Sequence, residues 1–127
     1  MLTITPVYAA LAAFLYLALS LRVIGHRRGE KVSYGDGGKG QMIKAIRTHG
    51  NFAEYAPFAL LLMAMVELQG ASGLLLNLLG LALLGGRLLH AYGFGRSPQI
   101  VILRQIGMLL TFGSIFVAAI ANIVLAV

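Results

Sequence analysis

The first long apolar run of the chain, residues 7–24, reads VYAALAAFLYLALSLRVI, and Arg22 is its only charged side chain. A helix needs about 20 mostly apolar residues to cross the hydrocarbon core of a bilayer, so this run predicts a transmembrane helix. Thr5 is expected to cap the start of that helix. Pro6 suits its first position, because proline has no N–H group to leave without a partner.

Three more apolar segments follow, and the composition of the whole chain agrees with them. Of the 127 residues, 59% are hydrophobic and only 11% are charged, which excludes an ordinary soluble protein of this size. We therefore predict an all-α, integral membrane four-helix bundle made of one domain, 1–127. Ser72 and Ser97 are expected to cap the third and fourth helices, with Pro98 at the first position of the fourth. The expected spans are about 5–25, 41–68, 72–92 and 97–126.

The basic residues gather toward one face of the predicted bundle. Seven of the ten lie between Arg22 and Arg47. The other three are Arg87, Arg96 and Arg104. With four spans, the first and third connections share one side of the membrane, and the positive-inside rule makes that side cytoplasmic. Both termini are then expected outside.

Two common kinds of site are not predicted. The glycine-rich segment 33–40 contains a Lys but lacks the Ser or Thr after it, and the strand before it, that a phosphate-binding loop needs. A flexible connection is expected there. The chain has no cysteine, and its three histidines show no spacing typical of metal ligands, so neither a disulfide nor a metal site is expected.

The second helix carries a polar face inside its span. Arg47, Asn51 and Glu54 follow one another at i, i+4 and i+7, so they share one side of the helix. Ionisable groups inside a span are costly and usually face a bundle interior or a polar cavity. A salt-bridge network that only fastens helix ends together is the alternative to a functional site.

Cations also lie within the third and fourth helices. Arg87 and Arg104 are flanked by Leu and Ile, so snorkelling to lipid headgroups explains them less well than it explains Arg96 in the connecting loop. The single negative charge of Glu54 cannot neutralise the three positive charges of Arg47, Arg87 and Arg104. The unpaired positive charge indicates an anionic ligand between the helices. A carboxylate suits arginine, whose guanidinium donates two parallel hydrogen bonds.

The second helix contains a pattern that resembles the signature of the MAPEG superfamily, the membrane-associated proteins in eicosanoid and glutathione metabolism. Residues 45–57 read AIRTHGNFAEYAP, with the family's Arg, an Asn four residues on and a Glu three beyond. Residues 86–90, GRLLH, look like the family's third-helix Arg and His. Residues 94–99, FGRSPQ, are similar to a segment that normally begins with Tyr, and Arg104 falls near the family's fourth-helix Arg. The resemblance covers nearly the whole chain.

This resemblance implies a homotrimer of a bacterial type, in the inner membrane, with glutathione bound between neighbouring subunits near the cytoplasmic end. The implied activity is that of a glutathione transferase or peroxidase, whose thiolate attacks a lipophilic electrophile arriving from the lipid. Arg104 is the implied catalytic residue, because a nearby cation lowers the pKa of a thiol. The residues implied to bind glutathione, the co-substrate, are Arg47, Asn51, Glu54, Arg87 and His90.

Two departures from the family pattern bear on catalysis. Phe94 stands where many members have Tyr and offers no hydroxyl to a thiolate, and Gly50 replaces a basic residue found in some members. A non-catalytic protein that binds glutathione or lipid is therefore the alternative within the family. A small multidrug exporter is less favoured, because such proteins need an acidic residue deep in a span, usually the first, and the first span here has none.

Overall fold

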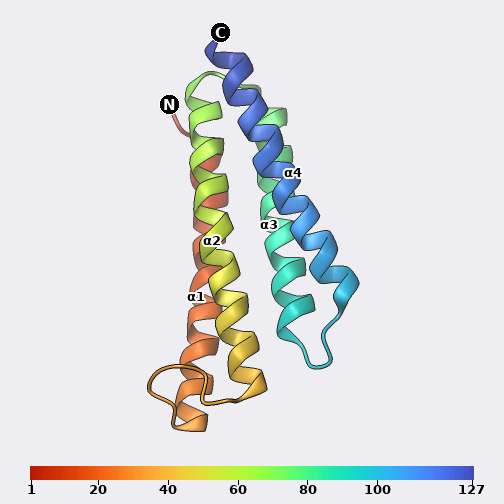
Figure 1. Ribbon diagram of the computed structural model, residues 1–127. Coiled ribbons are helices and arrows are strands. Elements are labelled where there is room, and N and C mark those ends of the chain that lie inside the picture. The colour runs from red at the N-terminus through yellow and green to blue at the C-terminus, as the bar shows by residue number, and fades with distance from the viewer.

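In the computed structural model, which describes residues 1–127, the chain forms four long helices and no strand. They are α1 (Thr5–Glu30), α2 (Gly40–Leu68), α3 (Gly73–Gly95) and α4 (Val101–Ala126). Helix α1 packs beside α2 and α3 beside α4, and both termini lie at the end of the bundle opposite the two longer loops (Figure 1). All four helices are long and apolar enough to cross a membrane, so the predicted fold class is confirmed.

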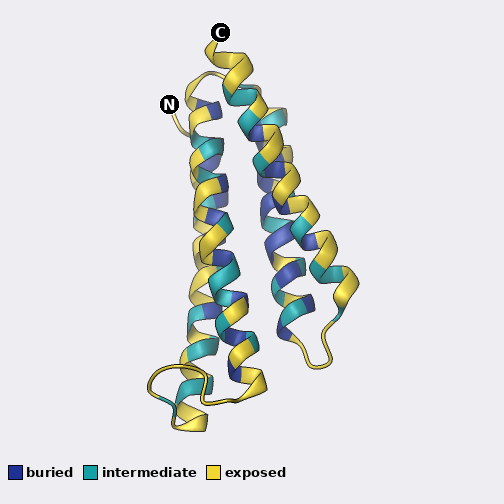
Figure 2. Cartoon of the chain, in the orientation of Figure 1, coloured by how far each residue is buried: buried dark blue, intermediate teal, exposed yellow.

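Large apolar side chains cover the outside of the bundle. Figure 2 shows buried residues where helices face one another and exposed residues around the outer surfaces. Phe14, Leu78 and Phe116 are each more than half exposed, as residues in contact with lipid are expected to be. The larger core cluster lies toward the end that carries the termini. Its members are Tyr8, Ala59, Met63, Val66, Leu76, Leu79, Leu83 and Ala118.

Helices α3 and α4 approach each other backbone to backbone. A Cβ atom placed on Gly86 would lie 2.8 Å from the carbonyl oxygen of Gly107, which is too close for any side chain. Small residues at such a crossing let two membrane helices pack tightly. The contact fixes the register between the two helices, and so it fixes Arg87 and His90 relative to α4.

The fourth helix begins later than predicted. Its first residue is Val101, so Ser97 is not a helix cap and Pro98 is not in the first turn. Ile100 is in an extended conformation, and its N–H group donates to the carbonyl of Gly93 at 2.8 Å. This hydrogen bond ties the loop back to the last turn of α3 and delays the start of α4.

The other boundaries lie closer to the expected ones. Ser72 caps α3 as predicted, since its Oγ accepts a hydrogen bond from the N–H of Leu75 at 3.3 Å. Helix α1 runs on to Glu30, beyond the expected end near residue 25. Arg27 and Arg28 stand in this added last turn, where positive charge interacts favourably with the helix dipole.

The start of α1 is capped by a side chain from α2. Thr5 is the first residue of α1 rather than the predicted cap, and no local side chain caps the helix. The buried carboxylate of Glu67 instead accepts the N–H groups of Ile4 and Thr5, each at 2.7 Å. It also accepts the N–H and the hydroxyl of Thr3. Negative charge here satisfies the free N–H groups and the positive end of the helix dipole.

Replacing Glu67 with Gln is expected to lower the free energy of unfolding by about 2 kcal/mol, because hydrogen bonds to a charged group contribute about 1.5–3 kcal/mol each. The measurement is denaturation in mixed detergent micelles, followed by circular dichroism. Glu30→Gln is the matched control. It breaks only a partly exposed pair with Lys39 at 3.5 Å and should cost about 0.5 kcal/mol or less. Equal losses in the two variants would contradict the capping role.

Candidate functional site

Arg87 is the centre of the polar contacts inside the bundle. Its side chain is only 2% exposed, although it carries a charge. The guanidinium donates to the Oδ1 atom of Asn51 on α2 at 2.6 Å and to the hydroxyl of Thr111 on α4 at 2.9 Å. A third, weaker contact reaches the sulfur of Met108 at 3.2 Å. Arg87 thus joins α2, α3 and α4, and every acceptor around it is neutral.

Arg47 and Glu54 behave differently from Asn51, which lies between them on α2. Both side chains are exposed on the surface of the chain. The one ion pair of the chain joins Glu30 and Lys39, so neither Arg47 nor Glu54 has an oppositely charged partner. The chain alone therefore does not form the salt-bridge network considered as the alternative from the sequence. A carboxylate at the midpoint of α2, as Glu54 is, needs a polar partner from outside the chain.

A stack of three side chains connects the end of α3 with the start of α4. The rings of His90 and Phe94 lie 5.7 Å apart, centre to centre. The guanidinium of Arg104, on α4, lies 5.2 Å from the centre of the Phe94 ring. It also donates a hydrogen bond to the Oε1 atom of Gln99 at 3.1 Å. Phe94 therefore lies beside Arg104 and offers it a ring without a hydroxyl.

Arg104 lies nearer the end of its helix than the sequence indicated. Because α4 begins at Val101 and not at the expected residue 97, Arg104 is in its first turn, whereas the expected start would place it about two turns inside. The start of α4 has no side-chain cap, so free N–H groups and the positive end of the helix dipole lie near this guanidinium. All three features favour an anion at this position.

Two cations from α1 and α2 hold the loop that leads to Arg104. Arg22 donates to the carbonyl of Gly95, and Lys44 donates to the carbonyl of Arg96 at 2.8 Å. Their hydrogen bonds satisfy carbonyl groups at the C-terminal end of α3, which has no helical partner for them. They thereby fix the α3–α4 connection against the other helix pair.

The residues that surround Arg87 were not predicted from the sequence. Thr111 and Met108 accept its hydrogen bonds, and the Tyr55 ring lies 5.8 Å from its guanidinium. Gly107, Thr111, Ser114 and Ala118 form the buried face of α4 at i, i+4, i+7 and i+11. That stripe of small residues was visible in the sequence and could have pointed to Thr111.

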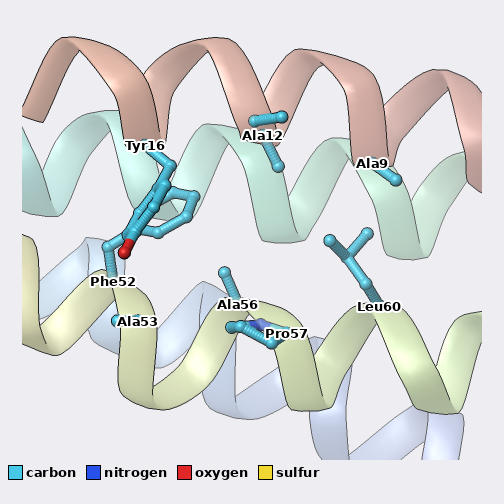
Figure 3. A pocket seen from close by; sticks show the side chains of 9 residues that line it. Ala9, Ala12, Tyr16, Phe52, Ala53, Ala56, Pro57 and Leu60 are labelled. Atoms are coloured by element: carbon cyan, nitrogen blue, oxygen red, sulfur yellow. The ribbon is translucent and has the colours of Figure 1, made fainter. Parts of the chain in front are cut away.

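An apolar groove of about 490 Å³ runs between α1 and α2. Alanines line most of it, among them Ala9, Ala13 and Ala53. Figure 3 shows Tyr16 of α1 beside Phe52 of α2 at one end, and their ring centres are 5.8 Å apart. Such a groove within the membrane-spanning segments offers room for a lipophilic molecule.

The polar residues beside the groove include no metal site. His49 stacks on Tyr16 at 4.8 Å, and its Nε2 atom lies 3.1 Å from the hydroxyl of Ser20. No group of three or more His, Asp or Glu side chains in the chain is close enough to hold a metal ion. The contact between His49 and Ser20 instead links α1 to α2.

The amino-acid sequence of the chain is similar to those of known membrane proteins. The sequence profile of the MAPEG family matches residues 5–124, which covers nearly all four helices. Similar relatives are the inner membrane proteins YecN of Escherichia coli strains K12 and O6:H1. Each is 38% identical over 120 residues, which is 94% of this chain and 90% of the relative.

Proposed function

This chain belongs to the MAPEG family, and from that premise we propose that it binds glutathione and uses the thiolate against a lipophilic electrophile in the membrane. The observation that carries the proposal is a set of charged side chains that have no oppositely charged partner within the chain. Arg47, Arg87 and Arg104 face no carboxylate of this chain, and Glu54 faces no cation. A ligand with both kinds of charge completes such a site.

The charges of glutathione match this set. The tripeptide has two carboxylates and one ammonium group, so it carries a net charge of −1, which becomes −2 in the thiolate form. The three arginines and Glu54 sum to +2. Glu54 suits the ammonium group, and Arg47 suits a carboxylate through two parallel hydrogen bonds. Arg87 holds the side chain of Asn51 through a hydrogen bond of 2.6 Å, and Asn51 is proposed to bind the peptide backbone of glutathione. His90 lies one turn after Arg87 on α3.

Arg104 is the residue proposed to act on the sulfur. A cation beside the thiol favours the thiolate, which is the nucleophile. In the transferase reaction the thiolate forms a bond to an electrophilic carbon, and the leaving group departs with its electron pair. In the peroxidase reaction the sulfur takes the terminal oxygen of a hydroperoxide, an alcohol leaves, and a second glutathione reduces the sulfenic acid to give disulfide and water. The groove beside Tyr16 is the proposed entry for the lipophilic partner.

We further propose a homotrimer with the two longer loops in the cytoplasm and both termini outside. Glu54 begins an exposed stripe on α2, continued by Phe58, Leu61 and Met65, which a second subunit would cover. The basic residues at the loop end support this orientation, because positive loops favour the cytoplasmic side. The mass of the detergent-solubilised protein tests the trimer. Alkaline phosphatase fused to the C-terminus, active only outside the cytoplasm, tests the orientation.

Glutathione binding is tested by isothermal titration of the detergent-purified protein. Glu54→Gln is expected to weaken binding about tenfold or more, because a charge-assisted hydrogen bond to the ammonium group is lost. Glu30→Gln, at the loop end, is the matched control and should leave the Kd unchanged. No binding by the unchanged protein, or an unchanged Kd in Glu54→Gln, would count against the proposal.

A second candidate function is glutathione binding at the same site without catalytic turnover. Phe94 favours it, since the ring beside Arg104 has no hydroxyl to donate to the sulfur. The ultraviolet absorbance of the thiolate distinguishes the two candidates. Bound glutathione that stays protonated at neutral pH would support the binding protein over the enzyme.

A further inference from the structure

All the sulfur atoms of this chain belong to its five methionines, because the sequence contains no cysteine. A peroxide can convert methionine to its sulfoxide, which replaces an apolar group by a polar one and is reversible. Met42 and Met63 are fully buried in the bundle and out of reach of such a reagent. Met65 lies on the stripe of α2 that is proposed to meet a second subunit, and Met1 is the first residue. Met108 is partly exposed and belongs to neither place.

Met108 lines a hollow of about 420 Å³ that is formed by residues of α4. The hollow also contains Arg104 and Gln105, together with Leu109 and Phe112. Met108 follows Arg104 by four residues, so the thioether and the guanidinium lie on the same face of the helix. The exposed side chains of Leu109 and Phe112 offer an apolar surface to the rest of a lipophilic molecule.

The sulfur of Met108 already contacts a charged hydrogen-bond donor. The Nη2 group of Arg87 donates to it at 3.2 Å. The other two nitrogens of this guanidinium donate to the oxygen atoms of Thr111 and Asn51. A thioether is a weak acceptor, so the contact with sulfur is the weakest of the three. An oxygen atom bonded to the sulfur would accept more strongly from the same donor.

These surroundings favour a sulfoxide at Met108 over one at an ordinary lipid-facing position of α4. Phe116 is such a position, since it is 68% exposed and no basic residue follows Arg104 in the chain. A sulfoxide there would place its oxygen in hydrocarbon without a donor, which costs free energy. At Met108 the oxygen would lie among Arg87 and Arg104, and neither has a carboxylate partner within the chain.

We propose that Met108 is a site of reversible oxidation by organic hydroperoxides, and that Arg104 assists the reaction. The sulfur attacks the terminal oxygen of the hydroperoxide, so that an S–O bond forms and the O–O bond breaks. The electron pair of the O–O bond leaves with the inner oxygen, which accepts a hydrogen bond from Arg104 and takes the proton of the terminal oxygen. The products are methionine sulfoxide and an alcohol. The sulfur is oxidised, the hydroperoxide is reduced, and glutathione takes no part.

The test uses the detergent-purified protein without glutathione, and cumene hydroperoxide as the oxidant. Mass spectrometry of proteolytic peptides follows the sulfoxide at each methionine. The variant Phe116→Met adds a more exposed thioether on the same helix, far from any basic residue. We expect Met108 to be oxidised about tenfold faster than the added methionine, the effect of one charge-assisted hydrogen bond in the reaction. Exposure alone predicts the opposite order, and equal rates or that order would overturn the proposal.

Variants of Arg104 separate assistance by the cation from simple access to the sulfur. Arg104→Gln is expected to slow the oxidation of Met108 about tenfold, because the charged donor to the leaving oxygen is lost. Arg104→Lys keeps a charged donor and should stay within about twofold of the unchanged protein. Arg96→Gln removes an exposed arginine from the preceding loop and is the control, with no change expected.

A rate in Arg104→Gln equal to that of the unchanged protein would overturn the role of Arg104. A slow rate shared by Arg104→Gln and Arg104→Lys would also contradict it, since the charge alone would then not suffice. Glutathione is absent from every measurement. The failure of this proposal therefore leaves the titration with glutathione unaffected, and a failed titration leaves the oxidation of Met108 to be decided by its own rates.

Discussion

Replacing Arg104 with Gln is expected to remove the thiolate of bound glutathione at neutral pH and to lower turnover about 100-fold, the effect of losing one group that stabilises a reacting anion. The guanidinium lies 5.2 Å from the centre of the Phe94 ring and stands at the uncapped start of α4. Thiolate absorbance and the rate with an aryl halide are the measurements. Arg96→Gln, an exposed arginine in the preceding loop, is the control and should change neither.

Phe94→Tyr provides the opposite change at the same place. It adds a hydroxyl beside Arg104, where it can donate to the sulfur, so turnover is expected to rise about tenfold through one added hydrogen bond. Tyr92→Phe removes a hydroxyl that contacts only Arg96, at 2.6 Å, and should leave turnover unchanged. If neither Arg104→Gln nor Phe94→Tyr altered the thiolate absorbance, the chemistry proposed at Arg104 would be wrong.

The second large effect is expected from the pair Asn51 and Arg87. Asn51→Leu should lower the free energy of unfolding by about 2 kcal/mol, because a buried guanidinium loses its shortest hydrogen bond. Arg87→Met removes the charge together with the need for that acceptor. The double variant should therefore lose about 1.5 kcal/mol less than the sum of the two single losses. Chemical denaturation in mixed micelles measures all four proteins of this cycle.

A distant asparagine provides the control for the cycle. Asn77 contacts Tyr8 near the other end of the bundle, so Asn77→Ala and Arg87→Met should be additive within about 0.5 kcal/mol. The same proteins can be titrated with glutathione, and Asn51→Leu should weaken binding. Additive losses for Asn51→Leu and Arg87→Met would show that the 2.6 Å contact contributes nothing to stability.

Hydropathy was enough to predict the four helices, because each apolar run is as long as the membrane requires. The helix starts were less predictable, since several are decided by contacts between distant residues. Ser97 and Pro98 have the local pattern of a helix start, yet the hydrogen bond between Ile100 and Gly93 places the start at Val101. Thr5 likewise looked like a cap, and no local pattern could reveal that a carboxylate 62 residues away serves instead.

The candidate site was predictable in its residue types and only partly in its geometry. Spacing on α2 placed Arg47, Asn51 and Glu54 on one face, and the structure brings Asn51 to Arg87. The depth of Arg104 was wrong, because it was counted from the wrong helix start. Thr111 and Met108, two of the three residues that accept from Arg87, lie on α4, and a pattern within one helix cannot show which neighbour it will face.

The carboxylate of Glu67 also bears on the order in which the protein can enter a membrane. The first helix leaves the ribosome without a cap, and its free N–H groups gain their acceptor only after the second helix has brought Glu67 to the same side. Synthesis therefore favours insertion of α1 and α2 together, as a hairpin whose tip is the basic loop. With that loop in the cytoplasm, as proposed above, its charges need not be translocated, and Glu67 caps α1 at the opposite end of the hairpin.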